Sequence, residues 1–518
     1  MTELHKQFLT KSLLPSSVIR QSLKRIEALS DLNIFVSVCP QLASQQASEA
    51  DTRYLEDRAL GPLDGVSLAV KDNFCTRDVK TSCGSRMLDN FVAPYNATVV
   101  QRCLDSGAVM LGKTNLDEFA MGSGTIDSYV GPTRNIWGGS AAYSLVTGDQ
   151  TLARHNPGPG DGDWVVAGGS SGGSAVAVAT GVSCAALGSD TGGSVRIPAA
   201  WTGIVSLKPS YGRLSRHGLV PLVNSLDCPG IMARSVGDIA AVLNTVQGRD
   251  IMDSTSVASD PVNIDALNTE SVKGLRIGIP QEFHCEGMSP EVVSAWSSVA
   301  SLLDDAGCKV VPVSLPHTSL AIPCYSVLNP CEVASNMSRY DGLEYGLRGE
   351  GASTEDMFAD GRARGFNEVV RGRILAGNYF LLKRHYDKYF KQALRIRRLI
   401  LEDYLAAWAR VDALLCPVTL GPPPAFSGFA AVDNRGQSAA QDHCTQPSNL
   451  AGVPALSLPV SLSSQQLPLA LQLVAPWQRD HTLLQLAAWL ETRLQFPKLV
   501  IDDDLLHDRS TQDTRSRL

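Results

Sequence analysis

The sequence predicts a large α/β protein with a mixed central β-sheet that helices cover on both faces. Residues 272–279 and 309–313 read as strands on either side of a helix over 290–303, a pattern typical of a βαβ unit. The apolar run 66–70 has the length and composition of a strand that is buried on both faces. Two later strands are expected over residues 413–416 and 469–474.

Composition narrows the class of protein. The 518 residues are 44% hydrophobic and 19% charged, which predicts a sizeable core rather than an intrinsically disordered chain. The formal charge of −7 argues against a protein that grips nucleic acid over its whole surface. The twelve cysteines form no C-x-x-C pair, which disfavours a zinc ribbon or a redox dithiol. Without an apolar run of 18 residues, no membrane span and no membrane partner are expected.

The N-terminal region, residues 1–60, is expected to be helical and packed on the main body. Val18, Ile19 and Leu23 fall at helical spacing, and the two serines that precede them have the side chains of helix N-caps. We therefore predict an amphipathic helix that begins at Ser16 or Ser17.

Lys71 follows the buried strand directly. A buried ammonium loses its hydration, so burial lowers the pKa of a lysine and favours the neutral amine. A neutral amine is able to accept a proton, and Lys71 is therefore a candidate catalytic base.

The segment Gly107–Thr114, GAVMLGKT, satisfies the P-loop pattern, but we reject a phosphate cradle there. A P-loop wraps its backbone around phosphate after a strand has ended, whereas the four variable residues here are themselves apolar and strand-like. The expected order is therefore helix, strand and turn.

A second motif, Gly168-Gly-Ser-Ser-Gly172, matches the nucleophile elbow G-x-S-x-G and would make Ser170 the nucleophile of an α/β-hydrolase. That mechanism also needs a downstream histidine. The sequence singles out none of the candidates, which are His217, His284, His317, His385, His443 and His481.

A third motif is longer and includes the second. Gly168–Ser174 is followed by an Ala/Val-rich helix and then by GSDTGGSVRIPAA over Gly188–Ala200. Together with Lys71, this pattern resembles the amidase signature family. The resemblance implies the amidase signature fold over residues 61–500, which would form one catalytic domain with a surface insertion at about 138–163. The remaining residues, 501–518, are expected to form a flexible C-terminal tail.

The resemblance also implies a Ser-Ser-Lys triad in which Ser194 is the nucleophile, Ser170 relays a proton and Lys71 is the base. A cis peptide bond between Gly169 and Ser170 belongs to the same pattern. The backbone N–H groups of Thr191, Gly192, Gly193 and Ser194 would form the oxyanion hole. Asp190 and Arg196 would hold this loop through charge-assisted hydrogen bonds.

Five further segments resemble one branch of the family, the glutaminase subunits of glutamyl-tRNA(Gln) amidotransferases. They are Gly112–Ser123, Gly131–Asn135, Ser215–Asp227, Glu332–Asp341 and Asn449–Pro454. The long 138–163 insertion is similar to the mitochondrial form, which implies a location in the mitochondrial matrix. The implied activity is hydrolysis of glutamine, with the ammonia used to convert Glu-tRNA(Gln) to Gln-tRNA(Gln).

The same resemblance implies a heterotrimer with amidotransferase subunits B and C. ATP, Mg²⁺ and most tRNA contacts would belong to the first of these two partners, and this chain would bind no metal or cofactor. The basic cluster between Lys383 and Arg398 is interpreted as a solvated helix face, with contact to RNA or a partner as the alternative.

Three residues are implied to read glutamine. Arg373 would pair with the α-carboxylate, Asp442 would bind the α-ammonium, and Tyr325 is a weaker match because the spacing differs from that of relatives. The alternative function is a free-standing amidase for other small or lipid amides, because the family acts on several substrate classes.

Overall fold

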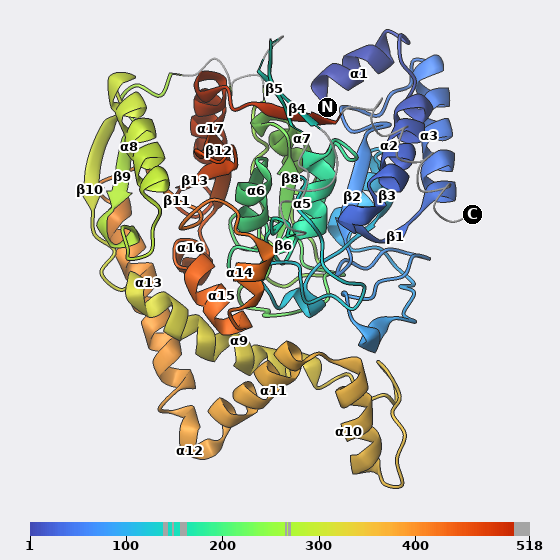
Figure 1. The fold of residues 1–518 in the computed structure, drawn as a ribbon, viewed down its shortest axis with the longest axis vertical. Helices are drawn as coiled ribbons and strands as arrows, with labels where there is room; N and C mark the ends of the chain where they lie inside the picture. The colour runs from blue at the N-terminus through green and yellow to red at the C-terminus, as the bar shows by residue number, and fades with distance from the viewer. Residues whose placement is uncertain (138–142, 148–149, 156–162, 265–266, 268–270, 502–518) are drawn as a thin grey trace.

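The computed structural model describes residues 1–137, 143–147, 150–155, 163–264, 267 and 271–501. Its centre is one mixed sheet of eleven strands (Figure 1). In spatial order, the strands are β1 (Phe35–Val38), β3 (Val109–Thr114), β2 (Ser67–Lys71), β6 (Ala185–Asp190), β8 (Cys228–Ala233), β7 (Val205–Lys208), β12 (Ala455–Leu462), β13 (Pro468–Val474), β11 (Ala413–Pro417), β9 (Arg276–Pro280) and β10 (Lys309–Val313). The mixed α/β architecture predicted from the sequence is confirmed.

Successive side chains of the central strands enter hydrophobic cores on opposite faces of the sheet, as the strand period of two requires. Leu68 and Val70 of β2 belong to the larger core, and Ala69 between them belongs to a second core. The helices over the larger core include α4 (Thr98–Asp105), α7 (Val236–Val246), α8 (Pro290–Asp305) and α17 (Asp480–Leu494). Those over the second core include α2 (Pro15–Ala28), α3 (Pro40–Leu55) and α5 (Gly172–Ala179).

Several predicted elements are present with small shifts of their ends. Strands β9 and β10 pair in parallel on either side of the helix α8, which confirms the βαβ unit. The segment Gly107–Thr114 contains β3 and follows α4, so the order is helix, strand and turn, and the P-loop is rightly rejected. Strands β11 and β13 cover the two later predicted strands.

Two local expectations are wrong. Helix α2 begins at Pro15, so Ser16 lies inside its first turn and caps nothing; the fixed φ of proline suits a first helical position. The Gly/Pro-rich insertion, for which the sequence predicts a surface loop, also contains strands, because β4 (Tyr143–Thr147) and β5 (Gln150–His155) form a hairpin and β4 pairs with β14 (Lys498–Ile501). The Pro/Gly-rich segment 156–162 and residues 502–518, for which a flexible tail is expected, lie outside the described residues.

A helical arm extends from the lower side of the sheet (Figure 1). It consists of α9 (Ala321–Met337), α10 (Thr354–Gly365), α11 (Glu368–Leu381), α12 (Lys383–Tyr386) and α13 (Phe390–Trp408). The other helices are α1 (Thr2–Leu9), α6 (Arg196–Thr202), α14 (Phe426–Ala430), α15 (Asn434–Gln441) and α16 (Gln446–Ala451). Within the described ranges, no helix combines the length and apolar character needed to cross a membrane.

Candidate active site

Lys71 occupies the last position of β2, where the parallel neighbour β6 also ends. The register pairs Val70 with Leu187, so the ends of the two strands place Lys71 beside Ser189. The Lys71 ammonium nitrogen donates hydrogen bonds to Ser170 Oγ at 2.8 Å, Ser189 Oγ at 3.0 Å and the Ser189 carbonyl oxygen at 3.4 Å. All three acceptors are uncharged.

The burial of Lys71 sets its protonation. Its side chain is fully buried, and loss of hydration lowers its pKa from the ordinary value near 10.5 to about 7. The carboxyl groups of Asp117, Asp190 and Asp227 act in the opposite direction but do not cancel the effect. Near neutral pH, a substantial fraction of Lys71 is therefore the neutral amine that a general base must be.

Ser170 is fully buried and follows a cis peptide bond from Gly169, as the motif implies. Asp117 fixes the surrounding loop, because its carboxylate accepts backbone N–H bonds from Thr125, Ile126 and Asp127. A Cβ atom on Gly169 would lie 2.2 Å from Oδ2 of Asp117, so only glycine fits this position.

Ser194 is the most accessible member of the predicted triad, since it is partly exposed where Lys71 and Ser170 are buried. The N–H of Ser171 donates to the carbonyl of Ser194 at 3.1 Å, which brings the two motifs together. In the described part of the chain, no hydrogen bond joins the hydroxyl groups of Ser170 and Ser194. A catalytic contact that is loose in the free enzyme tightens when substrate is bound.

A buried ion pair holds the loop that carries Ser194. Arg196 donates from Nε and Nη2 to the two carboxylate oxygens of Asp190, both at 3.1 Å, as the sequence predicts. Burial alone would raise the pKa of Asp190, but the Arg196 guanidinium and the Asn449 amide lower it to about 2. Arg196 also binds Thr445, Ser448 and Gln472, so it joins the nucleophile loop to α16 and β13.

The backbone N–H groups of the glycine turn do not all remain available for an oxyanion. Gly193 donates its N–H to Oδ1 of Asp190 at 2.9 Å, so its implied place in the oxyanion hole is not supported. The buried carboxylate requires this donor, as it does the N–H of Val195. Thr191 is held through its hydroxyl, which donates to Asp227 at 2.7 Å. The N–H groups of Thr191, Gly192 and Ser194 donate to no acceptor in the described chain.

Arg373 and Tyr325 lie in one hydrogen-bonded network on the arm. Arg373, on α11, donates to Oδ1 of Asn329 and to Oδ1 of Asn434, both at 3.1 Å. Asn329 in turn donates to the hydroxyl of Tyr325 at 2.8 Å. Arg373 and Tyr325 are both partly exposed, so the guanidinium is oriented without being sealed off from a ligand.

Asp442 lies at the end of α15, next to the glycine turn. Its Oδ2 would be 3.6 Å from a Cβ atom placed on Gly192. Burial raises the pKa of Asp442 to about 8, although Arg373 partly offsets this effect. A buried carboxyl without a cation in contact is well suited to receive one, since a positive ligand would stabilise its ionised form.

Sequence reasoning missed three residues of the site: Ser189, Asn73 and Asp117. Asn73 donates to Ser189 Oγ at 2.9 Å and thereby fixes the hydroxyl that faces Lys71. The sequence signal that could have identified Ser189 is its position within the GSDTGG motif. No histidine ring hydrogen-bonds Ser170 in the described chain, so the α/β-hydrolase interpretation has no support.

Comparison with known proteins decides the family. A family model described as Amidase matches residues 17–143 and 146–484. The chain belongs to the amidase family. The family predicted from the serine and glycine motifs is therefore confirmed.

Individual relatives of this amidase cover nearly its whole length. The A subunit of the mitochondrial glutamyl-tRNA(Gln) amidotransferase of Aedes aegypti is 50% identical over 499 residues, which are 96% of this chain and 97% of that protein. The solved A subunit of the Thermotoga maritima glutamyl-tRNA(Gln) amidotransferase has a TM-score of 0.73 and is 30% identical. The match covers 94% of this chain and 95% of that one. Native peptide amidase from Stenotrophomonas maltophilia has a TM-score of 0.75 and is 28% identical. The match covers 96% of this chain and 97% of that one.

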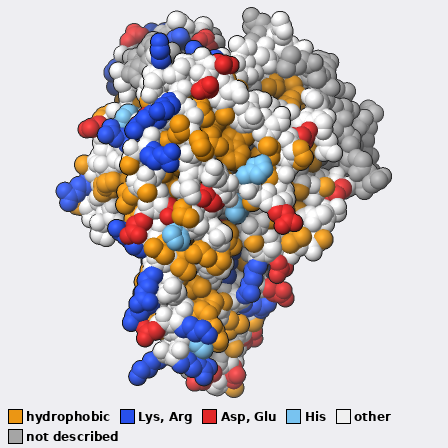
Figure 2. Space-filling model, turned by 90° about the vertical axis from the view of Figure 1, so that its left-hand side faces the viewer, with side chains coloured by type: hydrophobic (Ala, Val, Ile, Leu, Met, Phe, Trp, Pro, Cys, Tyr) orange, Lys and Arg blue, Asp and Glu red, His pale blue; other side chains and the backbone are white. Residues whose placement is uncertain are grey.

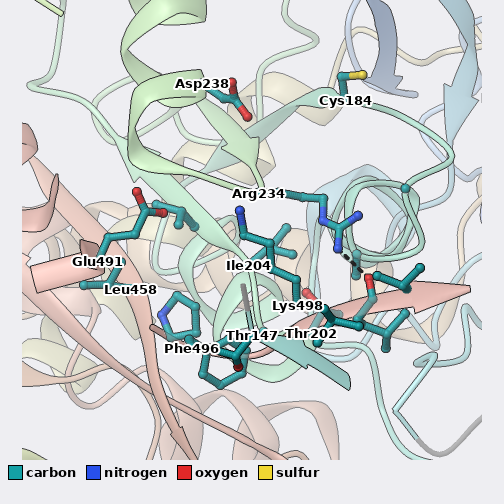
Figure 3. Close-up of a pocket in the computed structure, with 18 of the residues that line it drawn as sticks. Thr147, Cys184, Thr202, Ile204, Arg234, Asp238, Leu458, Glu491, Phe496 and Lys498 are labelled. Carbon is teal, nitrogen blue, oxygen red and sulfur yellow. Dashed lines mark hydrogen bonds between the residues drawn. The ribbon is translucent and has the colours of Figure 1, made fainter. Parts of the chain in front are cut away.

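A large cavity of this amidase lies away from the catalytic residues. It has a volume of about 830 Å³, and its lining includes Cys184, Arg234, Glu491 and Phe496 (Figure 3). Cys184 directly precedes β6, whereas the catalytic residues gather where β6 ends. The cavity therefore lies near the beginning of β6, and the catalytic residues lie near its end. Arg234 already donates to the carbonyl of Leu499 across it.

Proposed function

We propose that this amidase is the glutamine-hydrolysing A subunit of a mitochondrial glutamyl-tRNA(Gln) amidotransferase. The observation that carries the proposal is the buried, hydrogen-bonded Lys71–Ser170 pair beside the Ser194 loop, in a chain 50% identical to such a protein over 96% of its length. Arg373 and Asp442 supply the opposite charges that the carboxylate and ammonium of a free amino acid require.

The chemistry begins with proton transfer. Neutral Lys71 accepts the proton of Ser170, Ser170 accepts that of Ser194, and Oγ of Ser194 attacks the carboxamide carbon of glutamine. The N–H groups of Thr191, Gly192 and Ser194, which donate to no acceptor in the described chain, are the donors available to stabilise the resulting oxyanion. When the tetrahedral intermediate collapses, the C–N bond breaks and the stored proton returns to the leaving nitrogen, which departs as ammonia. Water then hydrolyses the γ-glutamyl ester and restores Ser194.

The ammonia would be used by partner subunits, proposed as B and C, to amidate Glu-tRNA(Gln) with ATP and Mg²⁺ bound outside this chain. The exposed face of the arm supports such an assembly. Lys and Arg side chains flank a hydrophobic strip there (Figure 2). Leu375, Tyr379 and Leu382, which follow one another at helical spacing, are 71%, 45% and 44% exposed, and a contiguous exposed apolar patch marks an interaction site. Arg397 is an exception within the basic cluster, because it binds Ser225 and the Leu450 carbonyl.

The test uses the chain together with the subunits that co-purify with it. Ser194→Ala should abolish amidation of Glu-tRNA(Gln) driven by glutamine and leave amidation driven by added ammonium salts intact. Ser183→Ala, which removes a buried hydroxyl bonded to the Ser67 and Ala185 carbonyls, is the matched control and should keep both activities. Loss of the ammonium-driven reaction in Ser194→Ala would contradict the division of labour. Faster hydrolysis of apolar amides than of glutamine would instead favour a free-standing amidase.

A further inference from the structure

Gln446 is a fully buried polar side chain whose amide makes no hydrogen bond. Its relative exposure is 0%, and neither Oε1 nor Nε2 has a partner among the described residues. Native proteins pair nearly all such groups, because an unpaired buried amide forfeits its bonds to water without compensation. In a functional site, such an amide is available to a bound water or to a group that arrives with the ligand.

The amide of Gln446 is held over the glycine turn of the nucleophile loop. Gln446 opens α16, and the neighbouring Thr445 hydroxyl donates to the carbonyl of Gly192 at 2.6 Å. A Cβ atom on Gly192 would lie 2.3 Å from Oε1 of Gln446 and 3.6 Å from Oδ2 of Asp442. Two oxygens from different side chains therefore converge on the same side of the turn.

Two convergent acceptor oxygens fit a ligand group with several donors. An ammonium carries three N–H donors and a positive charge, and Asp442 offers the complementary charge. One carboxylate cannot satisfy every donor of a buried ammonium, so a second acceptor in a fixed position adds to its recognition. The structural amides nearby contrast with Gln446: Gln437 donates to the carbonyls of Phe429 and Val432.

We propose that the side-chain amide of Gln446 binds the α-ammonium group of the substrate together with Asp442 and so determines specificity for an α-amino acid amide. This inference rests on the proposed function. It assigns to Gln446 a direct contact with substrate and no part in the proton transfers.

The test compares glutamine with 4-carbamoylbutanoate, which is glutamine without its α-amino group. Both substrates present the same carboxamide to Ser194, so the ratio of their kcat/KM values isolates the ammonium contact. In the co-purified complex, Gln446→Leu should lower kcat/KM for glutamine about tenfold or more and leave that for 4-carbamoylbutanoate within about twofold. Gln446→Met, a flexible side chain of similar length, should behave in the same way and serves if the leucine variant does not fold.

Gln437→Leu is the matched control. It removes a buried amide of the neighbouring helix and should lower the melting temperature without changing the substrate ratio. Covalent labelling of Ser194 by a fluorophosphonate at the wild-type rate shows that the nucleophile loop of each variant is intact.

An equal loss on both substrates would overturn the inference, because Gln446 would then act through the loop rather than on the ammonium. An unchanged ratio in both variants would overturn it too. A wild-type complex that does not hydrolyse glutamine would contradict the proposed function itself, a result separate from either outcome for Gln446.

Discussion

Ser189 offers Lys71 two oxygen acceptors, the hydroxyl at 3.0 Å and the carbonyl at 3.4 Å from the amine nitrogen. A neutral amine has two N–H donors and one lone pair. When Ser189 takes both donors, the lone pair is left to face Ser170, 2.8 Å away. Ser189 is thus a positioning residue that orients the base toward the proton that it must accept.

The first prediction concerns the pH dependence of the acylation step. Because burial lowers the pKa of Lys71 to about 7, the rate should rise with pH as the amine loses its proton and should level off above that value. Lys71→Met should lower kcat by about 10²–10⁴-fold, and Lys71→Arg should not restore it because a guanidinium keeps its proton. Pre-steady-state kinetics between about pH 5.5 and 9 measure both effects.

Lys113 supplies the control for this experiment. It is equally buried, at the end of the adjacent strand β3, but forms an ion pair with Asp72 at 3.3 Å. Lys113→Met should reduce stability and leave the midpoint of the pH profile in place. If the midpoint moved in Lys113→Met and stayed in place in the Lys71 variants, Lys113 rather than Lys71 would be the base.

A second prediction separates Ser189 from a purely structural serine. Hydrogen-bond acceptors favour the charged form of an amine, so Ser189→Ala should lower the pKa of Lys71 further and shift the midpoint of the rate profile to lower pH. The maximal rate should also fall, since the lone pair is no longer directed. Asn73→Ala, which removes the donor to Ser189, should produce a smaller shift. A lower rate with an unshifted midpoint would show that Ser189 contributes only packing.

The third prediction concerns glutamine binding. Burial raises the pKa of Asp442 to about 8, so the carboxyl is largely protonated in the free enzyme at neutral pH. Binding of an ammonium requires the ionised form and should therefore release a proton below that pH, and KM should fall as pH rises toward about 8. Calorimetry in buffers of different ionisation enthalpy measures the released proton. Asp442→Asn should raise KM and abolish the release, whereas a release that persists would point to another group.

A fourth prediction addresses stability. Arg196→Met leaves the carboxylate of Asp190 buried without its cation, which costs about 3–5 kcal/mol of folding free energy. The thermal or urea midpoint should fall accordingly. The double variant Asp190→Asn/Arg196→Met should regain part of the loss but no activity, since the loop of Ser194 loses its tether. A double variant less stable than Arg196→Met would contradict this account.

The sequence predicts the fold class and the triad because both depend on local patterns. The apolar run before Lys71 defines a buried strand, and the two glycine motifs carry Ser170 and Ser194. Contacts between distant segments leave no such pattern. Ser189 faces Lys71 only because β2 and β6 pair in parallel, and Gln446 reaches Gly192 only because α16 packs on the turn. Whether the Gly193 N–H is free to bind an oxyanion likewise depends on where the Asp190 carboxylate points.

The complete burial of Lys71 means that the reactivity of this protein is a property of its finished fold. In an unfolded chain the lysine is hydrated and protonated at neutral pH, and its serine is an ordinary alcohol. The neutral base forms only once β2 and β6 have paired and Lys71 is buried beside Ser189, so an unfolded chain lacks an activated serine. Recovery of amide hydrolysis after denaturation therefore reports when the fold around Lys71 is complete.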